Sequence, residues 1–397
     1  MSYLLQKNII SLSVSMHSKT KATNLNSMDH ACLQHLNYLS SEEIQFFMQK
    51  GYLHLKDIIP RSECHRYDQD VVKPALKKLA NLYEDDDSTW FLEHNNKLKP
   101  FVTQNNDSNN NDKGIPIGMM VFDSQNKEHC CNPISVEEDD NWGAIFNNEK
   151  IIGILDELHD FINSNKQRSD LDIQSQRRWK FLHSGVGWIH VRLPITQNND
   201  KFSNSIQMNV KQNTPNTSEE DQSFYIPRGE KTWHVDGGHF TPHKVSSPDQ
   251  SVIILPCLRD INSNCGNTLL LPGSHIQIAQ KLYENRENGV DKFELNDYCE
   301  ELASNWPSKD IVEVAPCSAG DILLLHPFIA HSAGRNRRKV IRKMKSDIDN
   351  FRLTFNIGTK WNEDTVLSIL DAGDLNMENC KNKPMSILEW SVVSSIL

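Results

Sequence analysis

The chain has 397 residues and a mass of 45.6 kDa, which suits one large domain or two modest ones. Its 42 basic and 52 acidic residues give a formal charge of −10, which disfavours binding to nucleic acid or anionic lipid. The nine cysteines are scattered without a CxxC pair, and no apolar run approaches the ~18 residues that span a bilayer. We therefore expect a cytoplasmic protein with reduced thiols that binds neither nucleic acid nor membrane, and whose oligomeric state the sequence leaves open.

The N-terminal part is expected to begin with a disordered tail over residues 1–38, followed by a helix. Ser40 or Ser41 can cap that helix, with Glu43 nearby, and apolar residues follow at helical spacing. Gly51 is expected to end the helix, after which the alternating sequence YLHLKDII predicts a strand.

The middle of the chain alternates between ordered elements and polar insertions. Amphipathic patterns predict helices over 60–83 and 150–165, and the run GVGWIHVRLP predicts a strand over 185–194. Two stretches rich in Asn, Ser and Asp, 104–113 and 197–222, cannot bury apolar area, so we expect them to be disordered surface insertions.

The strongest β signal lies between residues 224 and 361, where short apolar or alternating runs are separated by Gly, Pro, Asn and Asp. Such a pattern is typical of an antiparallel sandwich or barrel. One helix (276–285) and a loop (286–308) are expected to interrupt it, and ILLLHPFIAH is expected to form a single strand. Residues 366–397 are expected to pack on the domain as a C-terminal extension.

A candidate metal site begins in the segment KTWHVDGGHF. His234 and Asp236 lie two residues apart on an expected strand end, so both side chains point to one face and can share a metal ion. Such a pair occurs by chance in a chain of this composition, so it needs further support.

A second histidine near the Ser-Ala-Gly turn at 332–334 supplies that support. His331 lies next to the turn, whereas His326 would face the opposite side of a regular strand, so we prefer His331 as the ligand. With His234 and Asp236 it completes a 2-His-1-carboxylate facial triad, which leaves adjacent coordination positions open for a cosubstrate and dioxygen.

Ferrous iron in such a site needs a source of two electrons, which 2-oxoglutarate supplies by oxidative decarboxylation. Its distal carboxylate calls for a bidentate arginine on a strand beyond the second histidine. Arg352 opens the alternating strand FRLTFNIG and is our choice. Arg342, at the shorter spacing of 11 residues from His331, is the alternative.

These motifs resemble the phytanoyl-CoA dioxygenase family of Fe(II)- and 2-oxoglutarate-dependent oxygenases. LSSEEIQFFMQKGYLHLKDIIP is similar to the family's entry helix and strand, and WHVDGG, GNTLLLPGSH and GDILLLHPFIAHSAGRN follow in the family's order. The resemblance covers about 39–361, apart from the Asn-rich insertions.

The resemblance implies an α+β fold, a double-stranded β-helix (jelly roll, cupin-like) flanked by helices, in a dioxygenase domain over 39–365. It implies iron ligation by His234, Asp236 and His331. It places the 2-oxoglutarate arginine at Arg352 or, by the family's usual spacing, at Arg342. Fe(II), 2-oxoglutarate and O2 are the implied cofactors and cosubstrates, with ascorbate as a candidate reductant.

Three further residues are candidates for the cofactor pocket: Ser332, Trp188 and Thr268. The carboxylate at Asp236 argues against halogenation, because related halogenases place a small residue there to admit chloride. We therefore expect an oxidoreductase that couples 2-oxoglutarate decarboxylation to C–H oxidation of a small molecule. Hydroxylation, desaturation and oxidative ring closure stay open, as does the choice among a secondary metabolite, an amino-acid derivative and an acyl chain. The alternatives are a non-catalytic jelly-roll binding protein and a cupin-like iron enzyme that does not use 2-oxoglutarate.

Overall fold

The computed structural model of the chain describes residues 36–80, 119–122, 128–130, 144–160, 177–182, 188–192, 226–227, 229–237, 242–249, 251–263, 265–336, 352–362, 370 and 385–396. The tail expected over 1–38 lies almost entirely outside these ranges, as do both Asn-rich stretches. Within the described residues, no helix is both long enough and apolar enough to cross a membrane.

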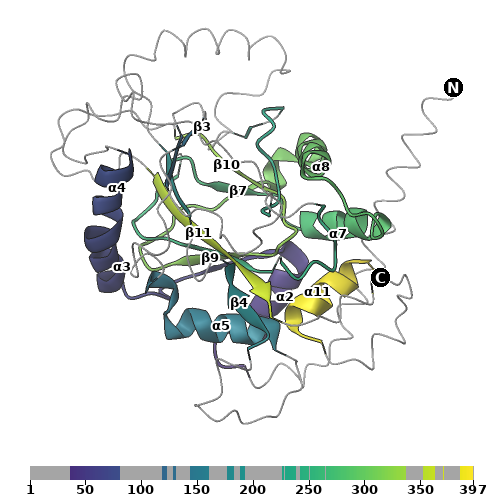
Figure 1. Cartoon of the computed structure of the whole chain (residues 1–397), viewed down its shortest axis with the longest axis horizontal. Coiled ribbons are helices and arrows are strands. Elements are labelled where there is room, and N and C mark those ends of the chain that lie inside the picture. Colours follow the sequence, from purple (N-terminus) through teal and green to yellow (C-terminus); the bar gives the residue numbers. More distant parts are fainter. Residues whose placement is uncertain are drawn as a thin grey trace, which may run out of the picture.

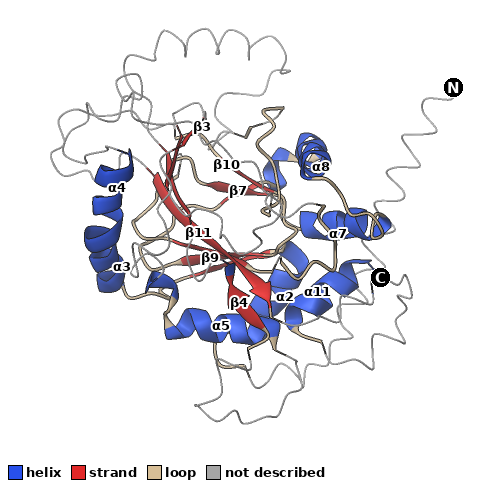
Figure 2. Ribbon diagram, viewed as in Figure 1, coloured by secondary structure: helices blue, strands red, loops and turns tan. Residues whose placement is uncertain are grey.

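The fold is a jelly roll built from two β-sheets, as predicted (Figures 1 and 2). The large sheet has the strand order β1-β9-β6-β11-β5-β2-β3, with β4 paired to β11, and the small sheet has the order β10-β7-β8. All pairs are antiparallel except β2 with β5. The strands are β1 (Tyr52–Leu55), β2 (Met119–Phe122), β3 (Glu128–Cys130), β4 (Trp179–Phe181), β5 (Trp188–Arg192), β6 (Ile253–Pro256), β7 (Thr268–Leu270), β8 (Val312–Glu313), β9 (Ile322–Leu325), β10 (His331–Ala333) and β11 (Arg352–Trp361).

Helices cover the outer face of the large sheet and one end of the molecule (Figure 2). They are α2 (Ser41–Lys50), α3 (Arg61–Tyr67), the π-helical turn Asp68–Val72, α4 (Lys73–Ala80), the 3-10 turn Ala144–Phe146, α5 (Glu149–His159), α7 (Ser274–Glu284), α8 (Lys292–Asn305), the 3-10 turn Ser308–Asp310 and α11 (Ile387–Ile396). The predicted start of α2 is confirmed, because Ser40 and Glu43 form a reciprocal capping box and Gly51 ends the helix with a left-handed φ of 79°.

Successive side chains of β11 point alternately into the core beneath the helices and toward the inside of the roll. Leu353, Phe355 and Ile357 belong to the core beneath the helices. Arg352 and Thr354 are on the opposite face, toward the inside of the roll, where they line a cavity of about 20 Å³. The neighbouring strand β5 continues this polar inner wall, because Arg192 pairs with Arg352 in register.

Two sequence predictions about the β region are wrong. The expected loop at 286–308 contains the helix α8, which begins where the Asp291 carboxylate accepts the Phe293 N–H (2.8 Å). Its buried apolar residues recur only at every fourth position. An apolar stripe this narrow does not stand out as a helical pattern in the sequence. The expected single strand ILLLHPFIAH is two strands, β9 and β10, in different sheets, because the chain turns at Pro327.

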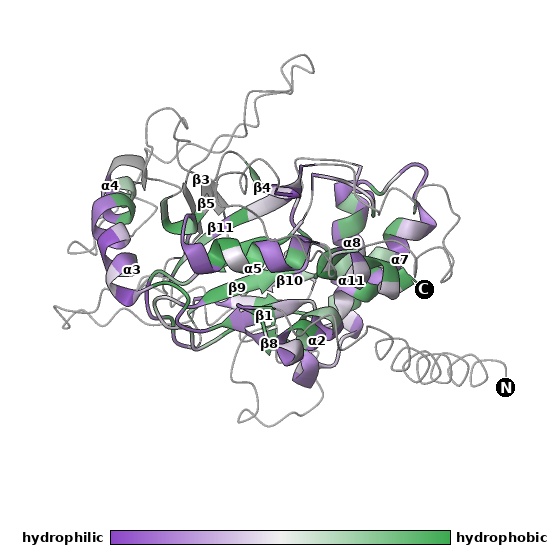
Figure 3. Ribbon diagram, turned by 90° about the horizontal axis from the view of Figure 1, so that it is seen from below, coloured by the Kyte–Doolittle hydropathy of each residue, from purple (hydrophilic) through white to green (hydrophobic). Residues whose placement is uncertain are grey.

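The C-terminal helix α11 packs against α5 and α7 and is apolar along most of its length (Figure 3). A buried ion pair attaches it to the sheet: both guanidinium Nη atoms of Arg178 donate to the Glu389 carboxylate at 2.9 Å. The two side chains are 5 % and 0 % exposed, so neither charge can exchange its partner for water. Arg178 also donates to the carbonyl oxygen of His159.

We expect Glu389→Ala to lower the free energy of unfolding by about 3 kcal/mol or more, because it leaves the Arg178 charge buried without its partner. Denaturant titration of the full chain measures this change. The control is Glu294→Ala, which breaks a surface pair with Lys281 in which Glu294 is 56 % exposed, and we expect a loss of under about 1 kcal/mol. Equal losses in the two variants would contradict the prediction.

His159 at the end of α5 is fully buried and held as the neutral imidazole. Its Nδ1 bonds to the Leu155 carbonyl (2.7 Å) and its Nε2 to the Ser251 hydroxyl (2.5 Å). Burial lowers the pKa of His159 from 6.5 to about 4. Between these two values the unfolded chain binds a proton that the folded chain does not.

His159 should therefore make the protein less stable as the pH falls from about 6.5 toward 4. The contribution is about 2 kcal/mol between pH 7 and pH 5. Unfolding free energies of wild type and His159→Gln measured across this range isolate it, since the variant cannot titrate. Identical pH dependences of the two proteins would show that the prediction is wrong.

Candidate active site

The candidate site is assembled by one backbone bridge between segments far apart in the sequence. The His234 N–H donates to the His331 carbonyl (3.0 Å), and the His331 N–H donates to the His234 carbonyl (2.9 Å). His331 opens β10, whereas the segment around His234 is otherwise irregular. This reciprocal pair places the two imidazoles on the same side, with ring centroids 4.4 Å apart.

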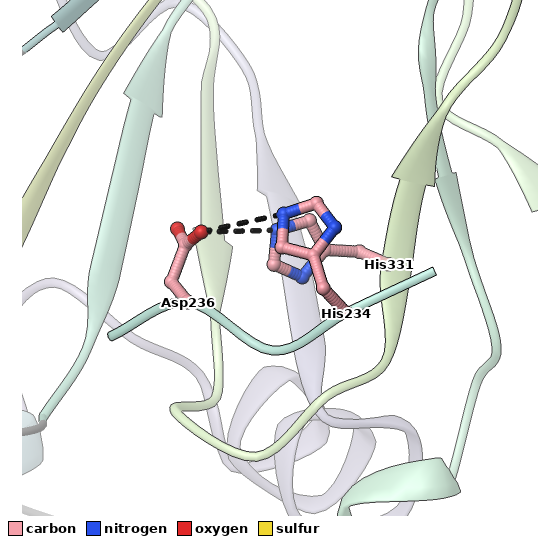
Figure 4. A group of neighbouring side chains, drawn as sticks. All are labelled: His234, Asp236 and His331. Atoms are coloured by element: carbon pink, nitrogen blue, oxygen red, sulfur yellow. Dashed lines mark ion pairs between the residues drawn. The ribbon is translucent and has the colours of Figure 1, made fainter. Parts of the chain in front are cut away.

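Asp236 completes the cluster, because its carboxylate faces both rings (Figure 4). Its Oδ1 lies 3.5 Å from His234 Nε2 and 3.6 Å from His331 Nε2. Within the described ranges, this is the one group of His, Cys, Asp and Glu donors close enough to hold a metal ion, with all donor atoms within 4.8 Å of one another. His331 is 10 % exposed, whereas His234 and Asp236 are 40 % and 30 % exposed, so the cluster is open on one side.

Backbone carbonyls fix the orientation of both imidazoles. His234 Nδ1 lies 2.8 Å from the Thr232 carbonyl and His331 Nδ1 lies 3.1 Å from the Ile329 carbonyl. A carbonyl only accepts, so each Nδ1 carries a proton and each Nε2 faces Asp236, where it donates to the carboxylate when protonated and offers a lone pair to a metal ion when deprotonated. Although burial opposes ionisation of Asp236, the two histidines hold the pKa of this carboxyl well below its usual range.

A buried carboxylate on α8 supports the segment that carries His234. Glu300 Oε1 accepts the backbone N–H of Trp233 at 3.0 Å, and the Trp233 indole donates to the Pro227 carbonyl. Glu300 is 8 % exposed, and its Oε2 is buried without a hydrogen-bond partner. Sequence reasoning missed Glu300 because it placed a loop where α8 lies.

Arg352 is buried in the inner wall, near the cluster. Its guanidinium donates to the Gly266 carbonyl (2.5 Å) and to the Thr268 hydroxyl (2.7 Å) on β7. Thr268 pairs with Ala333 and Leu270 pairs with His331, so the partner of the guanidinium lies two residue pairs along the ladder from the second histidine. Burial lowers the pKa of Arg352 to about 10, which leaves it cationic at neutral pH. Its Nε is buried without a hydrogen-bond partner.

The structure brings together some of the predicted pocket residues and not others. Thr268 contacts Arg352, as described above. The Ser332 hydroxyl donates instead to Thr232 (2.9 Å), on the side of β10 opposite His331. Trp188 lies in β5 opposite Asn356, but its side chain is outside the described residues, and so is the whole of Arg342. His326 is fully buried between His275 and Phe47, away from the metal cluster.

The residues present suit both an iron ion and 2-oxoglutarate. Two imidazole nitrogens and one carboxylate oxygen are the donor set of non-haem Fe(II) oxygenases, and the open side of the cluster leaves room for further ligands. The orphaned Nε and the charge of Arg352 suit a carboxylate inside the roll. Fold and donor set together define the class of iron- and 2-oxoglutarate-dependent oxygenases.

Comparison with known protein families finds a match over part of the chain. Residues 163–344, just under half of the chain, match the model of the family described as phytanoyl-CoA dioxygenase (PhyH). No curated protein sequence matches the chain significantly. Over these residues the chain is similar to that family, so the resemblance predicted from its motifs is confirmed, and the chain is an oxidoreductase of the dioxygenase class. Fe(II), 2-oxoglutarate and O2 are the cofactors and cosubstrates of the class.

Several solved structures are similar at low identity. The 2-oxoglutarate-dependent carbocyclase SnoK from nogalamycin biosynthesis is 14 % identical, with 88 % of this chain and 92 % of that chain covered and a TM-score of 0.40. The epimerase SnoN, in complex with Fe3+, 2-oxoglutarate and a nogalamycin, is 14 % identical over 87 % and 92 %, with a TM-score of 0.38. HygX from Streptomyces hygroscopicus, with nickel and 2-oxoglutarate bound, is 12 % identical over 82 % and 88 %, with a TM-score of 0.36. Likenesses this weak transfer neither substrate nor reaction.

We expect Glu300→Ala to weaken divalent-metal binding about tenfold, because the Trp233 N–H loses its acceptor and the His234 segment loosens. Glu300→Gln retains an acceptor oxygen and should restore most of the affinity. Anaerobic titration with Fe(II) gives the dissociation constants, and thermal unfolding of each variant reports stability separately. Glu301→Ala, at the exposed neighbouring position, is the control. If metal affinity falls only as far as stability does, and Glu300→Gln does not restore it, then Glu300 does not position the His234 segment.

Proposed function

We propose that His234, Asp236 and His331 bind Fe(II), and that Arg352 anchors the distal carboxylate of 2-oxoglutarate. The observation that carries this proposal is the convergence of the three donors within 4.8 Å at one end of an inner wall that also holds a buried arginine. When bound, iron and 2-oxoglutarate supply the oxidising power for C–H oxidation through decarboxylation to succinate and CO2.

The protein's own contribution is to position the metal ligands and the cosubstrate and to exclude water from them. The carbonyl oxygens of Thr232 and Ile329 hold both imidazoles in the tautomer that offers Nε2 to a metal. Arg352 is fixed by Gly266 and Thr268, so it meets an incoming carboxylate without reorganising. Thr268, proposed from the sequence as a cofactor-binding residue, acts in this scheme by orienting Arg352.

We propose a small, polar molecule as the substrate. The inner wall of β11 and β5 presents two buried oxygens, Thr354 Oγ1 and Asn356 Oδ1, that have no hydrogen-bond partner among the described residues and lie on the face that Arg352 shares. Buried polar atoms of this kind favour a ligand with hydrogen-bonding groups over an unbroken acyl chain. Hydroxylation, desaturation and ring closure are all compatible with this wall, and a cytoplasmic location stays a prediction.

An anaerobic titration with Fe(II) and 2-oxoglutarate tests the assignment through the visible charge-transfer band of the chelate. We expect the wild type to form the band and His331→Ala to lose it. Arg352→Ala should raise the 2-oxoglutarate dissociation constant roughly thirtyfold or more, the equivalent of about 2 kcal/mol for removing one partner of a buried charge pair. Arg342→Ala is the matched control, with an affinity close to wild type.

Two outcomes would contradict the proposal. If Arg342→Ala rather than Arg352→Ala loses affinity, the anchor is the other arginine. If iron binds with no band at any 2-oxoglutarate concentration, the site uses iron without this cosubstrate.

A further inference from the structure

A pair of thiols lies beside the proposed cosubstrate anchor. Cys257 follows β6 and Cys317 lies in the turn before β9, and both line the small cavity that Arg352 also lines. Both residues are buried, 6 % and 5 % exposed, and the Cys317 thiol donates to the Val314 carbonyl (3.6 Å). Neither is in a disulfide.

Backbone hydrogen bonds hold the segments of the two cysteines side by side. At one end, the Cys257 N–H donates to the Asp321 carbonyl (2.8 Å) and the Gly320 N–H donates to the Cys257 carbonyl (2.9 Å). At the other end, Ile261 and Cys317 exchange both of their hydrogen bonds (2.8 and 2.9 Å). The thiol pair is therefore fixed by a closed ring of backbone contacts rather than by chance proximity.

A histidine and a carboxylate stand behind Cys317. His54 Nε2 lies 3.0 Å from Asp321 Oδ2, and the neighbouring Cys317 raises the pKa of the His54 imidazole. Asp321 is itself held by the backbone N–H groups of Asp57 and Ser318. A thiol, an imidazole and a carboxylate in this order are the arrangement that favours a thiolate.

The Cys317 environment differs from that of the other buried thiols. The hydrogen bonds from Cys257 and His54 hold the pKa of Cys317 below its usual value, whereas the pKa of Cys257 is raised. Burial raises the pKa of Cys64 to about 11 and that of Cys299 to about 12. The His54–Asp321 pair lies on the Cys317 side, where the Asp321 carboxylate also accepts the N–H of the next residue, Ser318, so Cys317 is assigned as the nucleophile and Cys299 is the reference for an inert thiol.

An open groove on the surface lies next to this turn. His54, Val314 and Ala315, which surround the turn, line an open groove of about 440 Å³ between α2, β1 and β8. The His54 side chain is 22 % exposed. The thiol pair thus lies between a surface groove and the interior anchor.

We propose that Cys257 and Cys317 form an oxidation site for small hydroperoxides. The Cys317 sulfur attacks the peroxide oxygen, the O–O bond breaks and an alcohol or water leaves, so that Cys317 becomes a sulfenic acid. The Cys257 thiol then attacks that sulfur, releases water and forms the Cys257–Cys317 disulfide. The peroxide gains the two electrons that the two thiols lose.

The disulfide restrains both segments that line the Arg352 cavity, so oxidation should weaken 2-oxoglutarate binding; this consequence rests on the function proposed above. Both thiols contribute to the electrostatic field at Arg352, so their conversion changes the charge environment of the guanidinium as well as its packing. Reduction by a dithiol should reverse both effects.

The test treats the full chain, loaded with Ni(II) so that no ferrous iron reacts with the oxidant, with an equimolar amount of hydrogen peroxide. Peptide mass spectrometry should find the Cys257–Cys317 cross-link, and 2-oxoglutarate affinity should fall several-fold and recover with dithiothreitol. Cys317→Ser should form no link, and its affinity should not respond to peroxide. Cys299→Ser is the matched control and should behave as wild type.

The outcomes separate the site from the proposed function. If Cys317 is oxidised no faster than Cys299, the oxidation site is overturned. A cross-link with unchanged 2-oxoglutarate affinity overturns the coupling to Arg352. If the protein forms the cross-link on oxidation but does not bind 2-oxoglutarate even when reduced, the oxidation site is retained and the proposed cosubstrate is wrong.

Discussion

The reciprocal hydrogen bonds between His234 and His331 are the constraint on which the candidate site depends. These two residues come from an irregular segment and from a three-residue strand, and neither element is long enough to fix a side chain by itself. The bridge supplies the missing rigidity, because two N–H···O bonds set the relative position of both Cα atoms. Everything else near the cluster acts on one side or the other of this bridge: Glu300 through Trp233, and β7 through its pairing with β10.

The alternation of β11 extends that constraint into the interior. Because successive side chains point to opposite faces, one strand presents Phe355 to the helices and Arg352 and Thr354 to the inside of the roll. The aliphatic residues of β6 and β9, which lie in the same sheet beside β11, form the neighbouring part of the interior, so the inner face of this sheet is apolar toward β6 and β9 and polar toward β5. An interior divided in this way can hold a charged cosubstrate without losing the core that stabilises the roll.

The sequence contained enough to predict the fold and to select the three residues that lie together in the candidate cluster, because both depend on local patterns: period-two alternation, Gly and Pro between strands, and a His-x-Asp pair. Contacts between distant segments were not accessible in the same way. Glu300 contacts Trp233 across 67 residues, and no periodicity encodes that contact. The division of ILLLHPFIAH into two strands depended on which sheet each half joins, which is a tertiary choice. The choice of His331 over His326 assumed that both lie on one regular strand and face opposite sides of it. The structure supplies a different reason, because the chain turns between them and His326 is buried beside His275.

The pairing of β1 with β9 has a consequence for how the chain folds. Tyr52 pairs with Leu325, so the edge strand β1 cannot pair until β9, more than two hundred residues later in the chain, has been made. The His54–Asp321 contact spans 267 residues in the same way. Contacts of such long sequence separation form late, because the entropy of closing the loop is lost before any contact repays it. During synthesis, β1 therefore leaves the ribosome as an unpaired strand next to the helix α2. Chaperones that shield strand edges would act on this protein mainly at that stage.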